Sequence, residues 1–262
     1  MRGISIVIPA YNSSRTLSIL TERIFETMDT MGCDLELVLV NDGSNDKTWE
    51  VIRELASTND RIIGLDLSRN FGQHNALLCG IRFARFDTCV TLDDDLQHPP
   101  EELPKLLGKL DEGYDVVYGV PVASQHGRAR ILGSVFLKWV GMVLFRIQRG
   151  TILSAFRAFR KDVIGGFHDL QGQSVSIDAI LSWNTSNFAH IRVRHDRRHY
   201  GKSNYNVRKL LTLSTTILLR FNYSRSANKS GRPPYIVREI AVKKPPDIRP
   251  RGELNETRSG RR

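Results

Sequence analysis

The chain has 262 residues, of which 40% are hydrophobic, and a formal net charge of +10. This is enough apolar material for one substantial core. No apolar stretch is long enough to cross a bilayer and no signal-peptide pattern precedes the first strand, so we expect neither a spanning helix nor a secreted chain. Cys79 and Cys89 lie in apolar runs and Cys33 stands apart from them, which indicates buried thiols in a reducing compartment.

The positive charge is concentrated at one end of the chain. From Asn222 onward there are 11 Lys and Arg residues against 4 Asp and Glu, in a stretch rich in Pro and Ser. This composition predicts a mostly disordered basic tail over 222–262. The tail lacks interleaved aromatic residues, so nucleic acid is not expected as a partner. An anionic membrane surface is the expected partner, and a solvated tail without any partner stays open.

Strand and helix patterns alternate along the first half of the chain. Apolar runs predict strands over 4–8, 35–40, 62–67, 89–92 and 116–119, and helical spacing predicts helices over 16–28, 46–55, 73–86 and 101–111. This alternation is typical of an α/β fold with a mainly parallel sheet and helices on both faces. Strands that are apolar throughout fit strands that are buried on both faces.

Three of the first four predicted strands end in polar clusters, at 9–12, 41–44 and 93–95. The carboxyl ends of parallel strands share one edge, where open α/β sheets bind ligands. Three adjacent acids, Asp93, Asp94 and Asp95, predict Mg²⁺ or Mn²⁺ shared with a phosphate-bearing substrate. The alternative is an exposed acidic turn that caps the following helix. Neither a GxGxxG motif after the first strand nor a P-loop is present, which argues against dehydrogenases and P-loop enzymes.

Four motifs resemble family 2 glycosyltransferases of the GT-A fold. They are Ile-Val-Ile-Pro-Ala-Tyr-Asn at 6–12, Val-Asn-Asp-Gly-Ser at 40–44, Leu-Ser-Arg-Asn-Phe-Gly-Gln-His at 67–74 and Asp-Asp-Asp-Leu-Gln-His-Pro-Pro at 93–100. Two further stretches, Ser-Ala-Phe-Arg at 154–157 and His-Asp-Arg-Arg-His-Tyr-Gly-Lys-Ser-Asn-Tyr at 195–205, resemble the polyprenyl-phosphate glycosyltransferases that act on dolichol or undecaprenyl phosphate. The resemblance covers residues 3–221 and implies a catalytic domain over 1–221.

The resemblance implies a set of residue roles. Contacts to the nucleotide would come from Pro9, Tyr11, Asn12, Asp42, Asp93 and Asp94. Asp95 and Gln97 would hold Mg²⁺ or Mn²⁺, and Asp93, Asp95 and Arg198 would be the catalytic residues. Gln73, Lys202 and Ser203 would add donor contacts, and Arg130 with Ser134 would receive the acceptor phosphate.

Several positions depart from the family pattern. Ser13, Pro121, Ala155 and Asn204 stand where relatives often have Glu, Arg, Asp and Lys. These departures leave the identity of the sugar and of the acceptor open. They also leave open that the chain is an inactive copy of such an enzyme. Many bacterial relatives also continue into two transmembrane helices, which we do not expect in this chain, and then into a segment similar to 231–240. We expect residues 234–240 to dock on the catalytic domain as an edge strand and the rest of the tail to be disordered.

These features together predict an inverting, metal-dependent glycosyltransferase. It would move a sugar from a nucleoside-diphosphate sugar to a polyprenyl phosphate. Apolar stripes near 136–144 and 207–221 have basic flanks, which fits peripheral attachment to the cytoplasmic face of the membrane, although both could pack on the sheet instead. Two alternatives stay open: a soluble GT-A enzyme with a hydroxyl acceptor, for which Asp93, Asp94 or His98 would be the base, and a non-catalytic sugar-nucleotide-binding scaffold.

Overall fold

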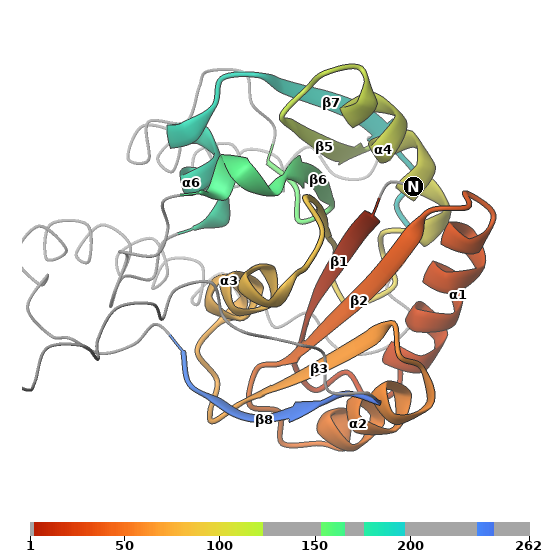
Figure 1. Cartoon of the computed structure of the whole chain (residues 1–262), viewed down its shortest axis with the longest axis vertical. Coiled ribbons are helices and arrows are strands. Elements are labelled where there is room, and N and C mark those ends of the chain that lie inside the picture. Colours follow the sequence, from red (N-terminus) through yellow and green to blue (C-terminus); the bar gives the residue numbers. More distant parts are fainter. Residues whose placement is uncertain (1–2, 123–152, 166–175, 197–234, 244–262) are drawn as a thin grey trace, which may run out of the picture.

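The computed structural model describes residues 3–122, 153–165, 176–196 and 235–243. Within them, eight strands form one mixed sheet in the order β7-β5-β6-β4-β1-β2-β3-β8 (Figure 1). The strands are β1 (Gly3–Ala10), β2 (Asp34–Asn41), β3 (Ile62–Leu67), β4 (Thr88–Thr91), β5 (Val116–Pro121), β6 (Arg157–Arg160), β7 (Phe188–Val193) and β8 (Val237–Ala241). The predicted α/β class, with helices on both faces of the sheet, is confirmed.

The centre of the sheet is parallel. β1 pairs with both β2 and β4, and β2 pairs with β3, in parallel register. Their residues are almost all buried, because the sheet is covered on both faces. The three polar clusters that follow β1, β2 and β4 therefore lie at one edge, as predicted.

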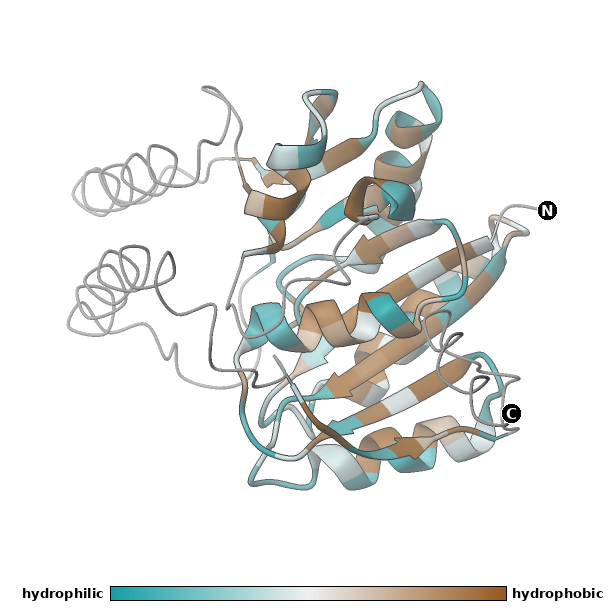
Figure 2. Cartoon of the chain, turned by 60° about the vertical axis from the view of Figure 1, so that its left-hand side comes forward, coloured by the Kyte–Doolittle hydropathy of each residue, from teal (hydrophilic) through white to brown (hydrophobic). Residues whose placement is uncertain are grey.

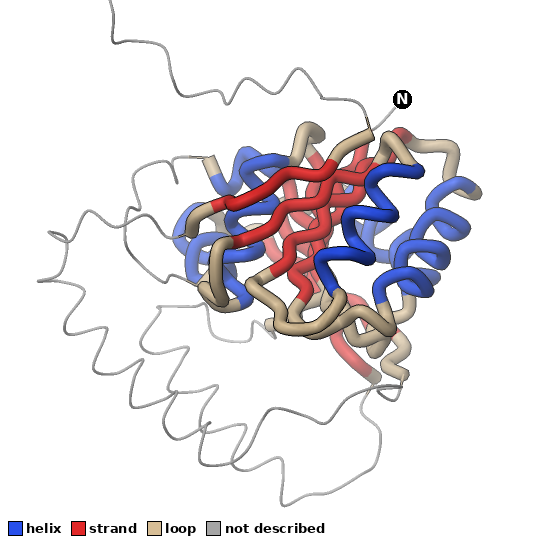
Figure 3. The backbone as a smooth tube through the Cα atoms, turned by 90° about the horizontal axis from the view of Figure 1, so that it is seen from below, coloured by secondary structure: helices blue, strands red, loops and turns tan. Residues whose placement is uncertain are grey.

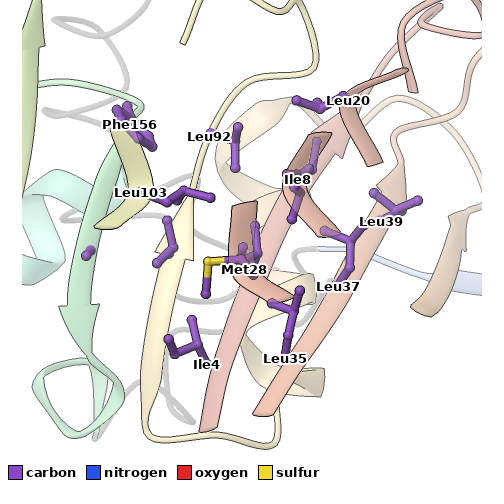
Figure 4. Packing of buried hydrophobic residues seen from close by; sticks show 14 of the residues in the cluster. Ile4, Ile8, Leu20, Met28, Leu35, Leu37, Leu39, Leu92, Leu103 and Phe156 are labelled. Atoms are coloured by element: carbon purple, nitrogen blue, oxygen red, sulfur yellow. The ribbon is translucent and has the colours of Figure 1, made fainter. Parts of the chain in front are cut away.

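Helices pack on both faces of this sheet (Figure 3). One face carries α1 (Leu17–Asp29), α2 (Thr48–Thr58) and α4 (Leu103–Asp111), the last preceded by the 3₁₀ turn η1 (Pro100–Glu102). The other face carries α3 (Gln73–Phe83) and α6 (Ile177–Asn184), with the 3₁₀ turn η2 (Lys161–Ile164). Figure 2 shows that the strands between them are predominantly hydrophobic. In Figure 4, Leu20 and Met28 of α1 pack over Ile8 of β1 and Leu37 of β2.

All four predicted helices differ from the structure by one to three residues at an end, and for two of these ends the hydrogen bonds give the reason. The helix predicted over 73–86 ends at Phe83, because the next backbone N–H groups are bound elsewhere: Arg85 N–H donates to the Glu36 carboxylate and Phe86 N–H to the Ser5 hydroxyl. The helix predicted from Asp46 begins at Thr48 instead. Oδ1 of Asp46 accepts a hydrogen bond from Thr48 N–H at 3.0 Å. Asp46 therefore lies outside the helix and gives a partner to an N–H group of the first turn, which has none within the helix.

Two strands run antiparallel to their neighbours. β6 lies between β4 and β5 and is antiparallel to both, whereas β5 pairs in parallel with β7. β8 pairs antiparallel with β3 at the end of the sheet (Figure 1). It begins at Val237 and ends at Ala241, so pairing starts after Pro233 and Pro234, which have no N–H to donate.

No helix within the described ranges is long and apolar enough to cross a membrane. The two apolar stripes near 136–144 and 207–221 lie outside those ranges.

Candidate functional site

The loops after β1 and β2 are joined by hydrogen bonds. Asn12 N–H donates to the Ser44 hydroxyl at 3.0 Å, and Asn45 N–H donates to the Asn12 side-chain oxygen at 2.9 Å. Asn12 has a φ of 56°, a left-handed conformation that Asn tolerates better than most residues. Both loops are therefore held in one arrangement before any ligand binds.

The loop after β2 is also fixed to the loop after β3, through Asp42. The carboxylate of Asp42 is buried and accepts hydrogen bonds from Phe71 N–H at 2.7 Å and Gly72 N–H at 2.9 Å. Burial raises the pKa of Asp42, and the two N–H donors oppose that rise. Gly43, with φ of 64°, completes the contact, since a Cβ there would lie 2.3 Å from the Arg69 carbonyl carbon. Asp42 thus braces two loops.

The acid cluster follows β4, and each acid has a different partner. Asp93 Oδ1 accepts a hydrogen bond from Gln73 Nε2 at 2.6 Å. Asp94 Oδ2 accepts hydrogen bonds from Tyr11 N–H at 3.1 Å and from the Ser13 hydroxyl. Asp95 Oδ1 accepts one from Gln97 N–H at 3.1 Å.

The electrostatics of this cluster favour a bound cation. Partial burial, followed by the charges of Asp95 and Asp94, raises the pKa of Asp93 to about 7. Burial also raises the pKa of Asp94. A positive ion placed among the carboxylates would favour their ionised forms.

The available ligands suit a hard divalent cation. Carboxylate and amide oxygens, as on Asp95 and Gln97, are the ligand type of Mg²⁺ and Mn²⁺. No group of three His, Cys, Asp or Glu side chains converges as a metal site in the part of the chain that the structure describes. These residues therefore fit a metal that takes its remaining ligands from substrate phosphates and water, as Mg²⁺ commonly does.

A buried arginine underlies the cluster, and the sequence did not reveal it as buried. The guanidinium of Arg157, at the start of β6, forms an ion pair with Asp178 of α6, and its Nε donates to the Thr91 hydroxyl at 2.9 Å. Tyr118 donates its hydroxyl to the same Asp178 carboxylate at 3.0 Å. The positive charge of Arg157 lowers the pKa of Asp93, opposing burial and the neighbouring acids.

His98 lies beside the cluster as a neutral side chain. Its ring lies 5.4 Å from that of Phe156 and 5.1 Å from that of His195. Burial, and next the charge of His195, lowers the pKa of His98 to about 4. Its Nδ1 atom has no hydrogen-bond partner among the described residues. A weak base of this kind is poorly suited to remove a proton from a hydroxyl near neutral pH.

A pocket of about 400 Å³ opens at the carboxyl ends of β2 and β3. Tyr11 lines it from the loop after β1, Gly43, Ser44 and Asn45 from the loop after β2, Leu67 to Asn70 from the end of β3, and Arg238 from β8. Pro9 and Asp42, both assigned to the nucleotide from the sequence, are buried, and neither lines this pocket. Asn12 and Asp94 are engaged in the loop contacts described above.

The remaining predicted site residues belong to the segments at 123–152 and 197–234. Arg130, Ser134, Arg198, Lys202 and Ser203 lie outside the described residues. Ser13, Arg157 and Arg238 were not assigned to the site from the sequence. Ser13 stood out there as a departure from the family pattern, Arg157 as part of the 154–157 motif, and Arg238 only as part of the predicted edge strand at 234–240.

This mixed sheet with helices on both faces is structurally similar to the GT-A glycosyltransferases. The family model for glycosyl transferase family 2 matches residues 5–165. The chain therefore belongs to glycosyl transferase family 2.

Two similar curated proteins carry the same name. The chain is 35% identical over 216 residues to undecaprenyl-phosphate 4-deoxy-4-formamido-L-arabinose transferase of Shewanella sediminis, covering 82% of this chain and 65% of that protein. It is 36% identical over 217 residues to the protein of the same name from Edwardsiella ictaluri, covering 80% and 65%. The match thus spans less than two thirds of the length of these relatives.

A solved structure shares the fold. Glucosyl-3-phosphoglycerate synthase from Mycobacterium tuberculosis, crystallised with Mn²⁺, uridine diphosphate and phosphoglyceric acid, superimposes with a TM-score of 0.61 at 20% identity. The match covers 86% of this chain and 79% of that one.

Proposed function

We propose that the protein transfers a sugar, with inversion, from a nucleoside-diphosphate sugar to a polyprenyl phosphate at the cytoplasmic membrane surface. The observation that carries the proposal is the acid cluster after β4, joined by Ser13 and Tyr11 to the loop after β1. It places three carboxyl groups at the edge where this fold binds ligands. Relatives named as undecaprenyl-phosphate transferases support the lipid phosphate acceptor.

A divalent metal fits the proposal. Mg²⁺ or Mn²⁺ on Asp95 and Gln97 would act as a Lewis acid toward the leaving diphosphate. The structural neighbour was crystallised with Mn²⁺ and a uridine nucleotide, which supports a divalent metal and does not choose between the two ions. Gln73 would hold Asp93 in place, and Asp94 would hold the Tyr11 loop. Arg198, Lys202 and Ser203 are proposed to contact the donor, and Arg130 and Ser134 the acceptor phosphate.

The acceptor chemistry also favours a phosphate. A phosphate monoester has a second pKa of about 6 and is already anionic near neutrality, so its attack on the anomeric carbon needs no strong base. Among the candidate bases His98 is a weak one, since its pKa is lowered to about 4, whereas the pKa of Asp93, raised to about 7, suits a base for a hydroxyl acceptor. A hydroxyl acceptor would need a stronger base than His98.

A donor screen tests the proposal. Nucleotide release from UDP-, GDP- and dTDP-sugars would be measured with Mg²⁺ or Mn²⁺, with and without a short polyprenyl phosphate. We expect release that requires both the metal and the lipid phosphate, and none from the Asp95→Asn protein. Release that is equal with a polyprenol lacking the phosphate would favour the hydroxyl acceptor. Absence of release with every donor and acceptor would contradict the proposed activity.

A further inference from the structure

The pocket at the ends of β2 and β3 includes one residue that comes from far along the chain. Arg238 of β8 lines it, although Arg238 is separated by 172 positions from Asp66 of β3, with which it pairs. β8 reaches this position because it runs antiparallel beside β3 (Figure 1). The strand therefore completes a ligand-binding edge that β1, β2 and β3 leave open on one side.

The Arg238 side chain is oriented before a ligand arrives. Its Nε donates to Asp66 Oδ2 at 2.6 Å, and its Nη2 forms an ion pair with the same oxygen. Asp66 is fully buried and also accepts a hydrogen bond from Asn41 Nδ2 at 2.7 Å, so the carboxylate itself is fixed. The Nη1 group of Arg238 has no hydrogen-bond partner among residues that the structure describes, and 60% of the side chain is exposed. A fixed donor of this kind loses little entropy when it binds.

The pocket is lined by hydrogen-bond donors and by no carboxylate. Two of its lining residues are arginines, Arg238 and Arg69, and Arg69 lies over the Phe71 ring at 4.8 Å from its centroid. The nearby Asp42 does not line the pocket, and its oxygens accept hydrogen bonds from Phe71 and Gly72. A ligand group that presents acceptor oxygens is therefore favoured here over one that presents amino groups.

The position in the sheet indicates which part of a donor nucleotide reaches this pocket. The acid cluster follows β4, and the order β4-β1-β2-β3-β8 places β3 and β8 three and four strands away. At about 4.8 Å per strand, this is a separation of roughly 14–19 Å. If the diphosphate lies at the acid cluster, as in the proposed function, the nucleoside extends across β1 and β2 and its base reaches β3.

We propose that Arg238 is a specificity-determining residue that recognises the base of the sugar-donor nucleotide. Its Nη1 donates to a ring carbonyl oxygen, the 4-oxygen of uracil or thymine or the 6-oxygen of guanine. Cytosine and adenine carry an amino group at the corresponding position. Both this amino group and the guanidinium are hydrogen-bond donors, so no hydrogen bond would form between them. A site built to hydrogen-bond one group rejects an analogue that lacks it much more strongly than an apolar pocket does. This inference rests on the proposed function.

Calorimetric titration of UDP, GDP, CDP and ADP, each with Mg²⁺, tests the inference on the full chain. We expect the protein to bind UDP at least about tenfold more tightly than CDP, or GDP at least about tenfold more tightly than ADP. Arg238→Lys keeps a positive charge opposite Asp66 but lacks the planar fork. It should weaken binding of the preferred nucleotide about tenfold and leave that of its amino counterpart unchanged.

Two further variants separate base reading from folding. Arg238→Ala should show the same loss of discrimination, with a lower Tm because the buried Asp66 carboxylate loses its positively charged partner and keeps only the hydrogen bond from Asn41. Lys243→Ala is the matched control, since Lys243 directly follows the β8 region and donates to the Thr58 carbonyl at 3.0 Å, away from the pocket. It should keep the wild-type preference.

The outcomes distinguish the two proposals. Arg238 variants that keep the wild-type preference, or that weaken both nucleotides of a pair equally, would overturn the inference alone. A wild-type protein that prefers CDP or ADP would overturn it too. A wild-type protein that binds none of the four nucleotides and no dTDP would overturn the proposed function, and the inference with it.

Discussion

The hydroxyl of Ser13 donates a hydrogen bond to the carboxylate of Asp94, joining the loop after β1 to the acid cluster after β4. Ser13 N–H in turn donates to the Thr48 hydroxyl at 2.7 Å, at the start of α2. One small, buried residue thus connects three segments of the site. A Glu at this position would bring a second carboxylate against Asp94.

Replacing Ser13 should weaken both the fold and the site. Ser13→Ala should lower the free energy of unfolding by about 1–2 kcal/mol, because Asp94 loses a charge-assisted hydrogen bond. Ser13→Glu should lower it further through like-charge repulsion and crowding. Urea unfolding measures both values, and Ser18→Ala, on the exposed face of α1, is the control that should change little. Equal stability of Ser13→Glu and the wild type would contradict this role.

Asp95→Asn should abolish sugar transfer without unfolding the protein, because it removes a charge at a half-buried strand end and no core volume. A loss of at least about 10²–10³ in kcat is expected if the residue holds the metal. Nucleotide-sugar binding should also become insensitive to EDTA. Near-normal turnover that still requires metal would show that Asp95 is not a ligand.

The ion pair between Arg157 and Asp178 should contribute far more to stability than an exposed pair. Only 2% of the Arg157 side chain is exposed, so Arg157→Met leaves a buried, uncompensated carboxylate and should cost about 3–5 kcal/mol. Arg61 pairs with Asp29 at 2.7 Å on the surface, and Arg61→Met should cost less than about 1 kcal/mol. Urea unfolding of the two variants gives the comparison. Similar losses would mean that Arg157 is not as enclosed as the structure has it.

The buried thiols should make stability fall at alkaline pH. Burial raises the pKa of both Cys79 and Cys89 to about 12, from an ordinary value near 9. Above pH 9 the unfolded chain loses these protons and the folded chain keeps them, so unfolding becomes easier as pH rises toward 12. The slope is at most about 1.4 kcal/mol per pH unit for each thiol.

Unfolding of the wild type and of the Cys79→Ala/Cys89→Ala protein between pH 8 and 10 measures this effect, and the double variant should show the shallower slope. Thiol labelling of the native protein at pH 8 should modify the half-buried Cys33 first. Equal labelling rates for all three thiols would contradict the burial.

The sequence predicted the parallel centre of the sheet well, for a physical reason. Ile62–Leu67 is buried at every position, so the apolar run and the strand coincide. β6 was not predicted, because Arg157–Arg160 is four residues long and half of it is arginine. Nothing in the local pattern shows that Arg157 is enclosed, since that depends on Asp178 in α6 and Thr91 in β4. Burial of a charge is settled by partners that lie far away in the chain.

The candidate site was predicted in part. The acid cluster and the loops at 9–12 and 41–44 do converge, because parallel strands bring their ends to one edge. The particular role of Asp42 was not visible, since a carboxylate that binds a ligand and one that binds the Phe71 and Gly72 N–H groups look alike in sequence. The place of Arg238 depends on the register between β8 and β3, which no local pattern encodes.

The pairing of β8 with β3 also has a consequence for synthesis on the ribosome. β3 is complete once residue 67 has been made, but its outer edge gains its partner only when residues 237–241 have emerged. At about 5–20 residues per second, the growing chain carries an unpaired apolar strand edge for roughly 10–30 s. During that interval the nascent protein should be most prone to bind chaperones or to aggregate, and a shortened gene that stops before codon 237 would make that exposure permanent.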